Sequence, residues 1–137
     1  MMRATYLVLV LVAASQAATS RDLVTQSSRV VDFGPLDPVA LDTRHYTVEL
    51  ENEHVRVVRV RYSARERGIL HEHRCGRVTV FLTPLHQGLR RPNGEAIESR
   101  ANAGDARWGT ADRHSDENLA DAPIELVYVD VKSACGG

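Results

Sequence analysis

The stretch Gly68-Ile69-Leu70-His71-Glu72-His73-Arg74-Cys75-Gly76 decides the fold, because two of its histidines stand one residue apart. Side chains alternate between the two faces of an extended chain, so His71 and His73 share a face and lie ~6.5–7 Å apart along it. Both imidazoles can therefore turn toward one ion. A metal site needs a third donor and usually a fourth, so the pair predicts further ligands elsewhere in the chain.

A second stretch, residues 104–118, offers the missing histidine. His114 is the only other histidine in a strand-and-turn pattern late in the sequence. We therefore expect His71, His73 and His114 to form a metal-binding triad. Three imidazoles suit iron, manganese, zinc, nickel or copper better than magnesium or calcium, which prefer oxygen ligands.

Together these residues resemble the two sequence motifs of the cupin family. His71 and His73 match the His-x-His of the first motif, and Gly104, His114 and Asn118 match the second. The similarity covers about residues 47–132. It implies an all-β fold, namely an antiparallel double-sheet jelly-roll β-barrel, with the metal inside the barrel. It also implies a small-molecule ligand or substrate that reaches the ion through the barrel mouth.

The chain departs from the family pattern at the fourth ligand. The glutamate of the first motif would fall at Arg77 or Val78, and residues 110–112 stand roughly where Pro-x-Gly is expected. Three neutral imidazoles leave the full double charge of the ion in place, which favours an anionic co-ligand. Two outcomes stay open for Arg77: its side chain faces outward, or the pocket binds an anion without metal. Gly76 can introduce a bulge that changes which face Arg77 occupies.

The remaining polar and aromatic candidates have simpler interpretations. We expect three histidines to be surface groups or hydrogen-bonded core groups: His45, His54 and His86. We expect three acidic side chains to face solvent: Glu72, Asp116 and Glu117. Trp108 is interpreted as a core residue. Asn118 is either a turn former or a hydrogen-bond partner of the ligands.

The amino terminus has the features of a secretory signal peptide. A positive charge at Arg3 precedes a short apolar run, and small residues lead to a cleavage point after Ala17. The run is far shorter than the ~20 residues of a membrane-spanning helix. We therefore expect an exported protein, periplasmic or extracellular, with no membrane insertion once the signal is removed.

Charge and length limit the partners and the domain count. The 137 residues include 17 basic and 18 acidic side chains, and removal of Arg3 leaves 16 − 18 = −2. Basic and acidic residues are interleaved without a basic stripe, so no nucleic-acid partner is expected. We divide the chain into a signal peptide (1–17), an amino-terminal arm (18–44), one cupin β-barrel domain (45–132) and a tail (133–137). A homodimer is left open.

The barrel should consist of short strands without a sustained helical period. Alternating apolar residues and turn signals predict about eight strands, of which seven can be bounded: 46–50, 55–62, 68–74, 78–83, 95–101, 106–110 and 124–132. An Asn-Gly turn at Asn93 and Gly94 precedes the fifth of them. Residues 30–41 should lie against the barrel or pair with an edge strand.

The two cysteines, Cys75 and Cys135, leave two interpretations open. An even number of cysteines behind an export signal favours a disulfide. The alternative is a pair of free thiols, with Cys75 close enough to the histidines to take part in the metal site.

Two hypotheses about function remain. The first is an exported cupin whose three-histidine site holds a divalent transition metal, in an enzyme that acts on a small anionic molecule. The alternative is a non-catalytic cell-envelope cupin that binds a small anion, a sugar or a protein without metal. No acid/base pair, nucleophile constellation or phosphate-binding loop identifies a reaction.

Overall fold

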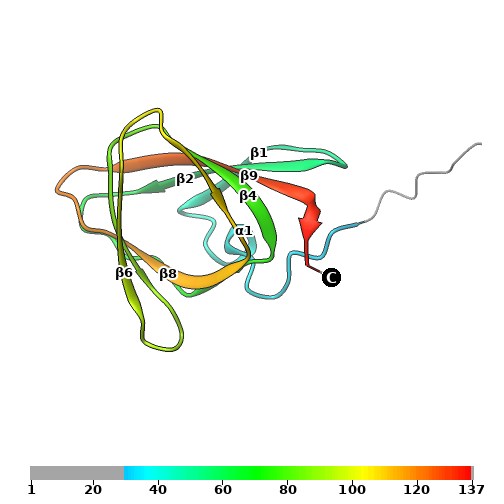
Figure 1. Cartoon of the computed structure of the whole chain (residues 1–137), viewed down its shortest axis with the longest axis horizontal. Helices are drawn as coiled ribbons and strands as arrows, with labels where there is room; N and C mark the ends of the chain where they lie inside the picture. Colours follow the sequence, from blue (N-terminus) through cyan, green and yellow to red (C-terminus); the bar gives the residue numbers. More distant parts are fainter. Residues whose placement is uncertain (1–29, 137) are drawn as a thin grey trace, which may run out of the picture.

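The computed structural model describes residues 30–136, which form two antiparallel β-sheets that face each other around one core (Figure 1). β1, β2, β9 and β4 lie on one side of the barrel in Figure 1, and β6 and β8 lie on the other. The predicted all-β, double-sheet jelly roll is confirmed. No helix among the described residues is long and apolar enough to cross a membrane.

The first sheet has the strand order β1-β2-β9-β4-β7. Its strands are β1 (Tyr46–Glu51), β2 (Val55–Tyr62), β9 (Ile124–Cys135), β4 (Cys75–Phe81) and β7 (Ala106–Gly109). The second sheet has the order β3-β8-β5-β6. Its strands are β3 (His71–His73), β8 (Asp112–Asn118), β5 (Leu85–Arg90) and β6 (Ala96–Ala101).

The core lies between the sheets because the central strands alternate. In β2, and in β9 as far as Asp130, every second side chain is buried. Burial of these side chains removes apolar surface from water, which is the main favourable term in folding. The buried apolar residues are Tyr46, Val58, Val60, Tyr62, Phe81, Leu85, Ile124, Leu126 and Tyr128.

Several elements differ from the sequence predictions. β8 was not predicted as a strand, because all seven of its residues are polar and it shows no apolar alternation. β5 is not among the predicted strands; Pro84 directly precedes it and Gly88 lies within it, and both residues are typical of turns. A single helical turn, α1 (Pro38–Leu41), also went unpredicted. β9 continues to Cys135, so strand pairing extends into the segment interpreted as a tail.

The arm packs against the barrel, as predicted for residues 30–41, although Val30 itself is 92% exposed. Asp37 forms a two-point ion pair with Arg56 of β2, with N–O distances of 2.7 and 2.8 Å. The Phe33 ring lies 3.3 Å from the Arg56 guanidinium carbon. The Leu36 carbonyl accepts a hydrogen bond from the Glu72 amide of β3. The arm therefore contacts both sheets.

A disulfide joins Cys75 at the start of β4 to Cys135 at the end of β9, as the even number of cysteines and the predicted export signal had favoured. The free-thiol alternative, with Cys75 as part of a metal site, is wrong. The bond closes a loop of 60 residues and fixes the chain two residues after His73. The signal peptide and the predicted mature start at Ala18 lie outside the described residues.

Candidate metal centre

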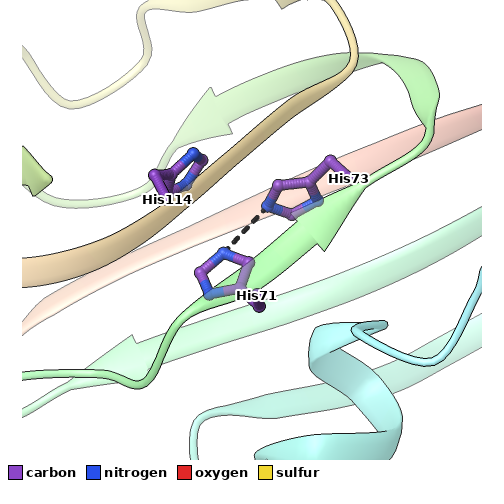
Figure 2. Close-up of side chains that lie close together, drawn as sticks. All are labelled: His71, His73 and His114. Carbon is purple, nitrogen blue, oxygen red and sulfur yellow. Dashed lines mark hydrogen bonds between the residues drawn. The ribbon is translucent and has the colours of Figure 1, made fainter. Parts of the chain in front are cut away.

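The three predicted histidines lie together inside the barrel (Figure 2). β3 pairs with β8 so that His71 stands directly opposite His114. His73 occupies the same face of β3 two residues on, which brings its ring beside the other two. One ligand atom from each residue lies within 4.8 Å of the other two. The exposed fractions of His71, His73 and His114 are 0%, 6% and 5%, so water has little access to the rings.

Hydrogen bonds on the outer side of the cluster orient two of the rings. Nδ1 of His71 lies 3.0 Å from the Ile69 carbonyl oxygen, and Nδ1 of His114 lies 3.2 Å from Asp112 Oδ2. Both partners are acceptors, so each Nδ1 is the donor, and Nε2 of the neutral ring is left with a lone pair. The Nε2 atoms of His71 and His73 are 3.2 Å apart. That is the spacing of two ligands that share one ion at about 2.0–2.1 Å.

Asp116 belongs to the cluster, which corrects the prediction that it faces solvent. It is 7% exposed. Its Oδ1 lies 3.4 Å from His114 Nε2, and its Oδ2 lies 3.5 Å from His71 Nε2. The signal in the sequence was its parity with His114, since residues two apart on a strand share a face.

The charges of the four groups depend on burial and on one another. Burial lowers the pKa of His71 and of His73 below the ordinary value, with Arg77 adding to the effect at His73. Both rings are therefore neutral at pH 7 and offer lone pairs. Burial opposes protonation of His114, but contact with Asp116 outweighs it and raises the pKa. Burial likewise opposes ionisation of Asp116, but contact with His114 outweighs it and lowers the pKa.

Arg77 faces the interior, so the outward-facing alternative is wrong. The pairing of β4 with β9 is irregular between Cys75 and Arg77, as the glycine between them had suggested. The Arg77 side chain lines the same cavity as His73, and its Nη1 donates to the Thr110 carbonyl oxygen at 2.9 Å. Burial lowers the pKa of Arg77, but a guanidinium is so basic that it keeps its charge at pH 7.

A cavity of about 180 Å³ opens onto the cluster, with walls from both sheets. The polar side chains in its lining include His73, Arg77, Gln87, His114, Asp116 and Tyr128. The Tyr128 hydroxyl is buried and has no hydrogen-bond partner among residues 30–136. A buried hydroxyl without a partner costs stability, so a ligand or water in the cavity would satisfy it.

The other candidates take no part in the cluster. Asn118 is fully buried, and its side chain bonds to three backbone groups, those of Ser63, Ala120 and Ala122, so it shapes a turn. Trp108 is 57% exposed, so its interpretation as a core residue is wrong. Three histidines pair with carboxylates away from the site: His45, His54 and His86.

Glu72 and Glu117 are each about one-third exposed and stand outside the cluster. They bind arginines at the surface. Of the three acidic residues predicted to face solvent, only Asp116 therefore turns toward the histidines.

The donor set suits a divalent transition metal. Imidazole nitrogen is a ligand for zinc, copper, iron and nickel alike, so the donors fit a metal without identifying it. A nearby carboxylate is compatible with each of these ions. The residues present therefore fit the kind of ion that the His-x-His pattern predicted.

Comparison with known proteins identifies the fold. No protein-family model matches the chain, and no curated protein matches its sequence. A crystal structure of a cupin domain from Bordetella pertussis Tohama I is similar at a TM-score of 0.60 and 25% identity, over 64% of this chain and 91% of that one. An uncharacterised conserved protein with a double-stranded β-helix domain from Klebsiella pneumoniae is similar at 0.52 and 20%, over 79% and 93%. The chain is a small protein with the cupin fold.

Proposed function

We propose that this protein is an exported cupin that holds one divalent transition metal through His71, His73 and His114 and takes a small anionic molecule beside it. The observation that carries the proposal is the convergence of three buried imidazoles from two strands. In His71 and His114, Nδ1 is hydrogen-bonded on the outer side of the cluster and Nε2 faces the other rings. Such an arrangement directs imidazole nitrogens from three rings toward one point, which is how a protein binds a transition metal.

The cavity supports an anion as the second ligand. Arg77 presents a charged guanidinium that can bind a carboxylate in two-point fashion, and Tyr128 offers a free hydroxyl close to His73. A volume of about 180 Å³ suits a molecule of a few non-hydrogen atoms and excludes a polymer. Apolar side chains also line the cavity, which limits water around the bound molecule.

A bound divalent ion would supply Lewis acidity, and iron or copper would add redox chemistry. The chain's own contribution is orientation. Arg77 would fix the anion by charge, and the Tyr128 hydroxyl would donate to it or accept from it. Leu89, Ile124 and Leu126 would hold the apolar part of the molecule in place.

The first prediction is that one equivalent of a divalent transition metal stabilises the wild-type protein and leaves the double variant His71→Ala, His73→Ala unaffected. An ion that binds only the folded state at 100 times its Kd adds about 2.7 kcal/mol to the free energy of unfolding. Elemental analysis and thermal unfolding with zinc, copper, nickel, iron and manganese measure the effect. His54→Ala is the matched control, because its ring is 76% exposed and remote from the cluster.

The same titration separates the two functions. Metal-loaded protein should gain further stability from a small dicarboxylate such as malonate. If no metal stabilises the wild-type protein but malonate alone does, the proposed metal site is wrong. The cavity is then a metal-free anion-binding site at Arg77.

Export is the second part of the proposal, and its prediction is a mature chain that begins at Ala18 outside the cytoplasm. The charged start, the apolar run and the small residues before the cut support it, and the Cys75–Cys135 disulfide suits an oxidising compartment. Amino-terminal sequencing of protein expressed in a bacterial host checks it. An intact Met1 on a cytoplasmic product would contradict the proposal.

A further inference from the structure

The carboxylate ligand that the first cupin motif would supply is absent from β4, where Arg77 occupies the place. A carboxylate nevertheless reaches the histidines from another strand. Asp116 lies on β8 two residues after His114, and its two oxygens approach different rings, at 3.4 Å from His114 Nε2 and 3.5 Å from His71 Nε2.

These contacts join acceptors to acceptors when the rings are neutral. Nδ1 of His71 and of His114 carries the proton, so each Nε2 presents a lone pair toward a carboxylate oxygen that also has lone pairs to offer. The Nε2 atom of His73 lies 3.2 Å from that of His71, so the third ring faces the same point. A positive charge stabilises such a group: a proton on His114 Nε2 pairs that one ring with Asp116, whereas a single divalent cation would satisfy all four groups.

We propose that Asp116 is a ligand of the metal, and that it replaces the absent glutamate of the first motif. The inference rests on the proposed function, since it names a further ligand of the same ion. Two donors at 2.0–2.2 Å from one ion and at tetrahedral or right angles to each other stand about 3–3.5 Å apart. The three distances of 3.2, 3.4 and 3.5 Å agree with this spacing.

The carboxylate is held in position by two further side chains. The Tyr46 hydroxyl donates to Asp116 Oδ2 at 2.9 Å, and Gln87 Nε2 donates to Oδ1 at 2.7 Å. Each oxygen accepts one of these bonds and can still share a second lone pair. Ligating carboxylates are commonly oriented by such partners, so Tyr46 and Gln87 act as positioning residues.

Coordination by Asp116 changes the charge of the centre. A divalent ion with three neutral imidazoles keeps a charge of +2, and a carboxylate ligand lowers it to +1. The lower charge makes a guanidinium in the same cavity tolerable, because the repulsion between Arg77 and the centre is halved. One anionic molecule could then bridge the metal and Arg77.

Cobalt(II) alone is the probe for the test, because its visible absorption reports the ligand set. Asp116→Asn should weaken cobalt binding by about 100-fold or more and change the shape of the absorption spectrum. The matched control is Asp112→Asn, which alters the other side of the same His114 ring. Loss of an outer partner weakens metal binding by about 10- to 100-fold, and the control should keep the wild-type spectrum shape.

Cobalt bound to Asp116→Asn within tenfold of the wild-type affinity, with an unchanged spectrum, would overturn the inference and leave the three-histidine site intact. Wild-type protein that binds no cobalt would overturn both. If Asp116→Asn fails to fold, infrared difference spectra of wild-type protein with ¹³C-labelled aspartate decide the question. Zinc loading should shift one carboxylate stretch, and the absence of any shift would contradict ligation.

Discussion

Replacement of Arg56 with methionine should lower the free energy of unfolding by about 3–5 kcal/mol at pH 7. Arg56 is 4% exposed and bonds both to Asp37, from the arm, and to Asp130, from β9. Methionine preserves most of the volume but leaves two buried carboxylates without their cation. The cost arises because an ionised carboxylate in the interior has lost water and gains nothing in exchange.

The destabilisation of Arg56→Met should shrink as the pH falls toward about 4. Burial raises the pKa of Asp130 even with Arg56 beside it, and removal of the cation raises that pKa further. The folded variant then binds more protons than the unfolded chain, so its stability increases as the pH decreases. Urea unfolding followed by circular dichroism at several pH values measures the change.

Arg61→Met is the matched control for Arg56→Met. Arg61 lies on the same strand, but its side chain is 59% exposed and reaches one surface carboxylate, Glu125, at 3.1 Å. The control should leave the free energy of unfolding nearly unchanged. A loss below about 1 kcal/mol for Arg56→Met would show that the buried ion pairs do not stabilise the fold.

Removal of the disulfide in the double variant Cys75→Ser, Cys135→Ser should lower the free energy of unfolding by about 4 kcal/mol. Closure of a 60-residue loop restricts the unfolded chain, and the chain-entropy model gives this magnitude. Wild-type protein in reductant should unfold at the same urea concentration as the variant. The variant should not respond to reductant at all.

Thiol titration under denaturing conditions provides an independent check of the disulfide. Oxidised wild-type protein should show no titratable thiol, and reduction should expose both cysteines. Two thiols before reduction would contradict the bond. Equal stability of wild type and double variant would contradict the entropic argument while leaving the bond in place.

The histidine cluster was predictable from the sequence because it depends on local spacing. His71 and His73 share a face on any extended strand, and His114 matched the spacing of the second cupin motif. Asp116 was missed although it has the same parity as His114. The reason is that β8 was not assigned as a strand. The rule that residues two apart on a strand share a face was therefore not applied to Asp116.

The fold itself was predictable where strands alternate between apolar and polar residues. β2 and β9 follow that pattern, and both were placed correctly apart from the end of β9. β8 breaks the pattern because its inward side chains face the polar cluster instead of the apolar core. Hydrophobic periodicity therefore does not reveal a strand whose inner face is polar. The orientation of Arg77 depended on a bulge, which spacing alone does not reveal.

The position of β3 at the edge of its sheet has a consequence for solubility. An edge strand presents unpaired amide and carbonyl groups that can recruit a strand from another molecule. β3 is only three residues long, and the arm occupies its open side through the hydrogen bond between Leu36 and Glu72. The arm thus shields the strand that carries two of the histidines from pairing with a neighbouring molecule.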